Sequence, residues 1–412
     1  MEDSRLAPTL TLWPAVGLAI TMVIGGGVLL LPGLAYEEAG RAAVWAWALA
    51  ALVSAPLLVI VATLGARHPA AGGIAGFVEP SLGRRASRMT EMLLLSAVTG
   101  GAGLIIVGGN AVGDWVGSDT LVLPVAFALL AVSVAVGLRG AAFAGSWLRA
   151  VSAVFIVALL AVALAGAIGG TDGAGMPAAS EVGDGAGTVG LVFFAFVGWE
   201  LMASMSEEFV NPRRDFPRAI ALSFGIVAGL YLLLAVSVQQ TLRLDDPNVD
   251  SSPVAATAEL LWGESGRILV STIGVVIVTA NIAGVLVAFS RLIFASARSG
   301  LLPRTLTRTD RRGTPVTAVL VTASVFALLA IAEQLGWVTQ ATLFRLAASA
   351  FFATFVVATI AFIAETTGAV RLFGFGALAI SVAVLASFGW FALYPLAVGA
   401  VALATAQRTQ ST

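Results

Sequence analysis

The sequence contains no cysteine and no lysine, and it has a single histidine among its 412 residues. The absence of cysteine excludes disulfides, thiol chemistry and cysteine metal sites. Charged residues make up only 11% of the chain and the formal net charge is -1, so the chain lacks the basic field that gathers nucleic acid. We therefore expect small-molecule partners and no nucleic acid.

Apolar residues are abundant, at 59% of the chain, which is typical of integral membrane proteins. Apolar windows of about 19 residues, separated by charged or Gly/Pro-rich connections, predict an all-α membrane protein with twelve transmembrane helices. The predicted spans are 11–36, 42–66, 89–114, 120–138, 147–169, 187–206, 218–240, 268–297, 314–335, 340–364, 368–386 and 388–406.

The arginines are distributed unevenly between the two sets of connections. With a cytoplasmic N-terminus, only Arg41, Arg243 and Arg267 fall in outer connections, while most of the 22 arginines fall in inner ones. Cytoplasmic loops of membrane proteins are enriched in positive charge. We therefore expect a multi-pass protein of the cytoplasmic (inner) membrane with both termini in the cytoplasm.

Three consecutive glycines, Gly25, Gly26 and Gly27, interrupt the first predicted span (TMVIGGGVLLLPG). An unsatisfied peptide group costs several kcal/mol in hydrocarbon, so a broken helix is expected there only where protein or a water-filled cavity covers it. Close helix packing through small residues is the alternative explanation. Glycine would let the backbone approach a ligand and adopt positive φ without steric cost.

A second interruption lies in the sixth span, LVFFAFVGWELMASMSEE, where Gly198 precedes Trp199 and Glu200. The first and sixth spans are five apart and enter the membrane from opposite sides. Interrupted helices at corresponding places in two inverted halves indicate a secondary transporter with its site at the membrane midplane. We predict one domain, 1–412, with a first repeat at 11–169, a second at 187–364 and two additional helices at 368–406.

The two interruptions would supply opposite polar groups. The free amides of Gly26 and Gly27 begin a half-helix whose positive dipole end suits a carboxylate. Carbonyls before each gap suit an ammonium group, so together they fit a zwitterionic α-amino acid. The predicted pocket has no charged side chain except Glu200, and a charged substrate side chain would be desolvated without a partner. Neutral, apolar substrates are therefore expected.

These motifs resemble those of the amino acid-polyamine-organocation (APC) superfamily. GGGVLLLPG is similar to its first-helix signature, AFVGWE to its sixth-helix Phe-x-Gly-Phe-Glu pattern, and EEFVNPRRDFPRAI to the cytoplasmic stretch that follows. The resemblance implies the leucine-transporter-like fold, a 5+5 inverted repeat with two additional helices, and amino acid transport by alternating access. Within the superfamily the amino-acid sequence is similar to those of bacterial methionine and branched-chain amino acid exporters. This implies export or antiport of methionine, leucine, isoleucine or valine; a proton- or sodium-coupled importer is the alternative.

The resemblance also implies roles for single residues. The carbonyls of Val23, Phe194 and Val197 would bind the substrate ammonium group, and the amides of Gly26 and Gly27 would bind its carboxylate. The full predicted substrate site is Val23, Ile24, Gly25, Gly26, Gly27, Phe194, Ala195, Phe196 and Val197. The rings of Phe194, Phe196 and Trp199 would form walls or gates, or else only face lipid or fill space between helices.

Coupling and gating candidates are Trp199, Glu200, Thr279, Asn281 and Arg345. Glu200 is either a structural carboxylate or a group that couples a proton to transport, and Arg345 either pairs with it or extends outward to the membrane surface. Thr279 and nearby carbonyls are candidates for a sodium site. We predict no cofactor or dedicated metal site. An intramembrane enzyme would need paired carboxylates, a histidine metal cluster or an activated nucleophile, which the sequence does not supply.

Overall fold

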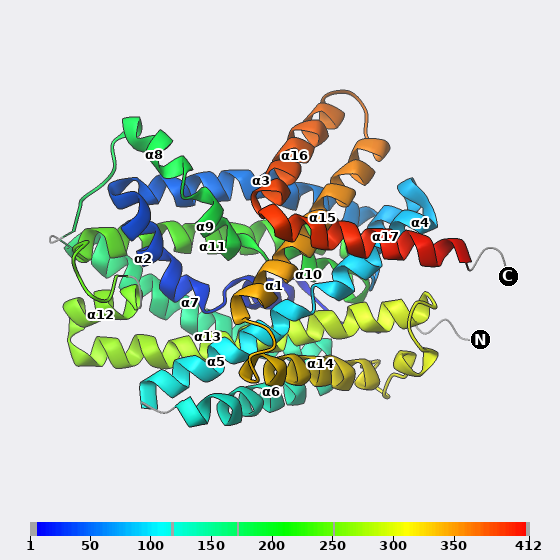
Figure 1. Ribbon diagram of the computed structural model, residues 1–412, viewed down its shortest axis with the longest axis horizontal. Coiled ribbons are helices and arrows are strands. Elements are labelled where there is room, and N and C mark those ends of the chain that lie inside the picture. Colours follow the sequence, from blue (N-terminus) through cyan, green and yellow to red (C-terminus); the bar gives the residue numbers. More distant parts are fainter. Residues whose placement is uncertain (1–5, 117–118, 171–172, 250–251, 409–412) are drawn as a thin grey trace.

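The computed structural model describes residues 6–116, 119–170, 173–249 and 252–408, and the regular elements in these ranges are helices α1 to α17 and short 3-10 turns (Figure 1). The helices in the first half are α1 (Leu12–Val23), α2 (Gly27–Ala39), α3 (Ala43–Arg67), α4 (Ile74–Ser96), α5 (Thr99–Val116), α6 (Val122–Leu138) and α7 (Ala141–Gly169). Those in the second half are α8 (Val182–Ala186), α9 (Val189–Phe193), α10 (Trp199–Ala203), α11 (Pro212–Thr241), α12 (Pro253–Trp262), α13 (Glu264–Arg298), α14 (Val316–Gln334), α15 (Gln340–Glu365), α16 (Gly368–Ser387) and α17 (Leu393–Arg408).

Each of the twelve predicted spans coincides with helical structure, which confirms the all-α membrane fold. Over the described ranges, eight helical segments are long and apolar enough to cross a membrane. The shorter apolar helices are α1, α6 and the segment 389–402. The first and sixth spans are each made of two half-helices, α1 with α2 and α9 with α10.

The helices pack in a pattern that repeats between the two halves. Helix α5 packs on α6 as α13 packs on α14, and α7 packs on α11 as α15 packs on α3. Figure 1 shows α8 and α12 near one end of the long helices, while the last turns of α17 and the α13–α14 connection lie at the other end. The exact repeat boundaries stay a prediction.

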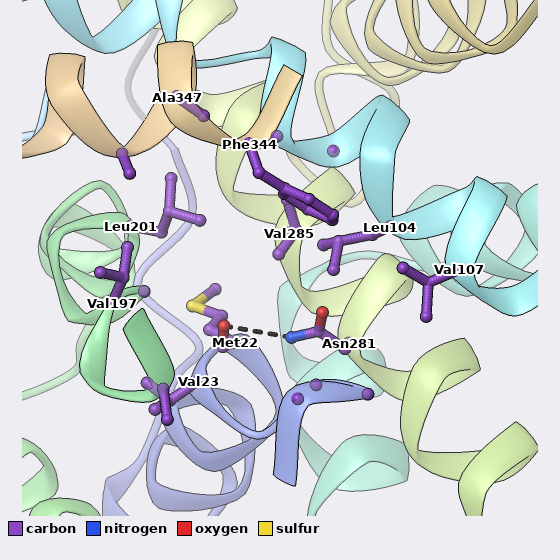
Figure 2. Close-up of a pocket in the computed structure, with 18 of the residues that line it drawn as sticks. Met22, Val23, Leu104, Val107, Val197, Leu201, Asn281, Val285, Phe344 and Ala347 are labelled. Carbon is purple, nitrogen blue, oxygen red and sulfur yellow. Dashed lines mark hydrogen bonds between the residues drawn. The ribbon is translucent and has the colours of Figure 1, made fainter. Parts of the chain in front are cut away.

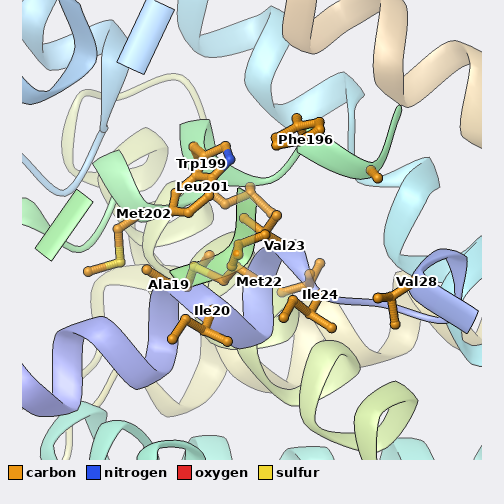
Figure 3. Packing of buried hydrophobic residues seen from close by; sticks show 14 of the residues in the cluster. Ala19, Ile20, Met22, Val23, Ile24, Val28, Phe196, Trp199, Leu201 and Met202 are labelled. Atoms are coloured by element: carbon orange, nitrogen blue, oxygen red, sulfur yellow. The ribbon is translucent and has the colours of Figure 1, made fainter. Parts of the chain in front are cut away.

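The interrupted first span lies in the middle of the molecule. Helix α1 packs against α7, α11 and α13 and also contacts α10. Its residues from Ala15 to Val23 are all buried, and the apolar ones among them, several of which Figure 3 shows, belong to one apolar core that continues into α3, α11 and α13. The broken backbone is therefore enclosed by protein, the condition under which a membrane-embedded interruption is tolerated.

Candidate substrate site at the two helix interruptions

The first interruption covers three residues between α1 and α2. Ile24 has an extended backbone (φ -75°, ψ 102°) and its amide donates to the Ile20 carbonyl at 2.7 Å. The amides of Gly25, Gly26 and Gly27 have no hydrogen-bond acceptor among the described residues. The expectation of positive φ at these glycines is wrong: none of the three has it, and Gly26 is in the right-handed helical region. Close approach, and not unusual φ, explains glycine at two of these positions, because a Cβ would lie 3.0 Å from the Asn281 Oδ1 at Gly25 and 2.9 Å from the Val107 side chain at Gly26.

The second interruption separates α9 and the 3-10 turn Phe194–Phe196 from α10. Here Gly198 has φ 127°, a conformation that glycine adopts without steric cost. A Cβ at Gly198 would lie 2.5 Å from the Met22 carbonyl oxygen and 3.2 Å from the Val23 Cα. The two interruptions are therefore in direct contact, and any side chain at this glycine would push them apart.

Glu200 stabilises the second interruption. Its side chain is 1% exposed, and its Oε2 accepts a hydrogen bond from the Gly198 amide at 3.0 Å. Its Oε1 has no hydrogen-bond partner within the described part of the chain. Of the two alternatives for Arg345, the outward one holds: its exposed guanidinium lies over the Phe391 ring, 5.4 Å from the ring centroid, and does not pair with Glu200. Glu200 is thus a buried carboxylate held by backbone at the break.

A cavity of about 370 Å³ lies beside the interruptions, within the size range of small-molecule sites. Of the predicted site residues, it is lined by Val23, Gly25, Gly26, Gly27, Ala195, Val197 and Asn281. Its described lining includes no acidic, arginine or histidine side chain, and its polar side chains are Tyr231, Asn281 and Gln340. Figure 2 shows Leu104, Val107 and Phe344 on one side of the cavity and Val197 and Leu201 on the other.

Other predicted residues lie outside the lining. Phe196 packs against Trp47 and Tyr231, with ring centroids 6.2 Å and 5.4 Å away, and Trp199 packs against Phe224 at 6.0 Å. These two rings fill space between helices, the alternative that the sequence left open. Three further residues are placed as follows: Ile24 is fully buried, Thr279 donates to the Val275 carbonyl of its own helix at 2.7 Å, and the side chain of Phe194 is outside the described residues.

Sequence reasoning missed most of the cavity wall. The missed residues include Gly100, Leu104 and Val107 on α5, Val285 and Phe289 on α13, and Phe344, Ala347 and Phe351 on α15. The three on α15 follow a helical spacing of three and four residues, which marks one helix face. That signal does not distinguish a cavity wall from ordinary helix packing.

Carboxylates close the end of the molecule that is predicted to be cytoplasmic. Glu207 accepts hydrogen bonds from the amides of Leu6 and Ala71, at 3.1 and 2.9 Å, and pairs with Arg298 at 2.6 Å. Glu208 pairs with Arg291 at 2.7 Å, and both side chains are buried. The cavity contacts α13 at residues 281–289, so these pairs lie beyond it along the same helix.

The opposite end of the cavity reaches the start of α15. Gln340, the first residue of that helix, lines the cavity, and its Nε2 donates to the Gly103 carbonyl at 3.2 Å. At the end predicted to be cytoplasmic, the amino-terminal segment adds to the closure, because the Leu10 amide donates to the Glu208 carbonyl at 2.7 Å. The cavity therefore lies nearer to the end predicted to be extracellular.

Both the fold and the sequence are similar to those of known proteins. The crystal structure of MhsT in complex with L-phenylalanine matches with a TM-score of 0.68 at 13% identity, covering 94% of this chain and 99% of that one. The chain thus has the leucine-transporter-like fold. The uncharacterized amino acid permease YecA of Bacillus subtilis is 29% identical over 406 residues, covering 96% of this chain and 95% of YecA. The L-methionine/branched-chain amino acid exporter YjeH of Escherichia coli is 28% identical over 309 residues, covering 72% of this chain and 71% of YjeH.

The amino acid permease family model matches residues 10–410, nearly the whole described chain. Two interrupted helices, free backbone amides and a cavity between them are the features that such a carrier needs at its substrate site. The chain belongs to the amino acid permease family of the APC superfamily and is an integral membrane amino acid transporter.

Proposed function

We propose that this transporter carries neutral, apolar amino acids of the methionine, leucine, isoleucine and valine class by alternating access. The observation that carries the proposal is the cavity wall: free amides stand at the first interruption, and the remaining described lining is apolar apart from Tyr231, Asn281 and Gln340. A charged substrate side chain would lose its hydration there without gaining an ionic partner. An apolar side chain would gain from the same wall.

The substrate backbone would bind between the two breaks. The amides of Gly25, Gly26 and Gly27 would donate to its carboxylate, aided by the positive end of the α2 dipole. The carbonyls of Val23 and Val197 accept no hydrogen bond from the described residues and would accept from its ammonium group. Its side chain would then extend toward Leu104, Val285 and Phe344, which line the same cavity.

Export of the substrate, alone or in exchange for another solute (antiport), is favoured over import. The name of YjeH describes an exporter of L-methionine and branched-chain amino acids, and that protein aligns with 72% of this chain. The bias of arginines toward one set of connections supports cytoplasmic termini. The Glu207 and Glu208 contacts would then close the cytoplasmic end, so that the described conformation is one in which the cavity lies toward the outside.

The test is counterflow in proteoliposomes with a panel of labelled amino acids, with and without imposed pH and sodium gradients. Neutral apolar amino acids should exchange and arginine or glutamate should not. Exchange of charged amino acids with no exchange of leucine or methionine would refute the substrate class.

A proton- or sodium-coupled importer is the second candidate. The buried Glu200, with one carboxylate oxygen lacking a described partner, favours a proton among the coupling ions. Glu200→Gln retains an oxygen that can accept from the Gly198 amide. If Glu200 carries the proton, this variant should bind substrate but lose the pH dependence of transport; unchanged pH dependence would remove Glu200 from the proton path.

A further inference from the structure

The carbonyls at the end of α1 have an unusual hydrogen-bond donor. In a continuous helix the Thr21 and Met22 carbonyls would accept from the amides four residues later, those of Gly25 and Gly26. Instead, Asn281 on α13 donates from its Nδ2 to the Thr21 oxygen at 2.6 Å and to the Met22 oxygen at 3.1 Å. Figure 2 shows the second of these bonds among the residues that line the cavity. Asn281 is 2% exposed.

We propose that Asn281 is the positioning residue that keeps α1 interrupted. A primary amide has two N–H donors on one nitrogen, and here these two donors replace the two helix amides. The amides of Gly25 and Gly26 are thereby left available to a substrate carboxylate. The inference rests on the proposed function for its ligand, but the replacement of donors is a property of the free protein.

The other end of the amide explains why the interruption uses glycine. A Cβ built on Gly25 would lie 3.0 Å from the Asn281 Oδ1 and 3.4 Å from its Cγ. The side chain of Asn281 thus occupies the space beside the Gly25 backbone that a larger residue would need. The Asn281 side chain, from α13, and the Gly25 backbone, from the α1–α2 connection, therefore pack directly against each other.

The amide also occupies a place where a cation would otherwise bind. Unwound backbone carbonyls at an interrupted helix are typical ligands of a coupling Na⁺. Thr21 and Met22 present such carbonyls, but a neutral N–H donor already satisfies both. The hydroxyl of Thr279, the predicted sodium ligand, donates instead to the Val275 carbonyl. The interruption therefore holds its shape without a cation at this position.

The decisive variant is Asn281→Asp, which has nearly the same shape but presents oxygen instead of the N–H donors. We expect leucine or methionine binding, measured with purified protein in choline chloride, to weaken about 10- to 100-fold, as two hydrogen bonds are lost. Replacing choline with Na⁺ should restore part of the affinity of the variant, because a cation can bridge the carboxylate and the two carbonyls, and it should leave wild-type binding unchanged. The matched control is Thr272→Val on the same helix, which should bind like wild type, because the exposed Thr272 hydroxyl donates to the Ile268 carbonyl and does not line the cavity.

Two results would overturn the role of Asn281: Asn281→Asp binding within twofold of wild type in choline, or a loss that Na⁺ does not reduce at all. Asn281→Ala provides a second route if the aspartate variant does not elute as a folded monodisperse protein.

Backbone hydrogen exchange at residues 24–27 needs no substrate, so it separates this inference from the substrate proposal. In Asn281→Ala the freed carbonyls should pair with the Gly25 and Gly26 amides, and exchange at these residues should slow relative to wild type. Exchange that is unchanged or faster would refute the inference, whatever amino acid the transporter carries.

Discussion

Gly27 allows the carboxylate site to be tested separately from the fold. A Cβ at Gly27 would meet only the side chain of Leu31, one turn along the same helix, with the nearest atom at 3.3 Å. Gly27 is also the first residue of α2 and lines the cavity. A side chain here should fit the fold yet occupy the space in front of the free amides.

Substituting Gly27 should have opposite effects on the stability of the protein and on its affinity for substrate. Replacing a helical glycine with alanine stabilises by about 0.5–1 kcal/mol, so Gly27→Ala should unfold at the same or a higher temperature than wild type. Losing a hydrogen bond to a charged group costs about 1.5–3 kcal/mol, which corresponds to roughly 10- to 150-fold weaker binding. Gly27→Val should bind still less, because its side chain is larger.

The assay is equilibrium binding of labelled leucine or methionine to purified protein, with thermal unfolding measured on the same samples. The matched control is Gly225→Val, since a Cβ at this exposed glycine of α11 meets nothing within 4 Å and the residue does not line the cavity. Gly198→Ala should behave differently and lower stability, because its Cβ would clash with the Met22 carbonyl. Binding by Gly27→Val equal to that of Gly225→Val would refute the assignment of the carboxylate site.

Three further predictions concern the closure and the cavity wall. Arg291→Met should lower the free energy of unfolding by about 3–5 kcal/mol, because it leaves Glu208 buried without its ion partner; a loss below about 1 kcal/mol in chemical denaturation would contradict this. Burial opposes ionisation of Glu207, but the hydrogen bonds and charge of Arg298 outweigh it and lower the pKa of Glu207. A carboxylate whose pKa is lowered in the folded state stabilises the fold at pH values above its unfolded-state pKa of about 4.3. This contribution to stability is lost as the pH falls below that value. The stability advantage of wild type over Glu207→Gln should therefore be constant between neutral pH and about 5 and shrink below about 4, whereas an advantage that disappears by pH 6 would contradict the pairing. Phe344→Ala removes a ring that lines the cavity and so enlarges the cavity. Amino acids with larger neutral side chains, such as phenylalanine, should then compete better against labelled leucine, and an unchanged order of competing amino acids would show that Phe344 does not determine specificity.

The sequence by itself determined the spans, the interruptions and the family. Hydropathy, arginine placement and the glycine triplet are local signals, because the bilayer imposes a length on each helix and a penalty on each unpaired peptide group. For the same reason the free amides of Gly26 and Gly27 and the burial of Glu200 followed from short stretches of residues.

Only the tertiary structure decided which side chains face the cavity. Phe196 and Trp199 were reasonable wall candidates, but at an irregular break no helical period fixes their direction, and both pack against α3 or α11 instead. Arg345 and Glu200 both fall within predicted spans, but the fold does not bring them together, and the Arg345 guanidinium lies over the Phe391 ring instead. The contact from Asn281 to Thr21 and Met22 joins residues about 260 positions apart. Hydrogen bonds across such separations depend on how helices pack, and no local pattern in a single sequence encodes them.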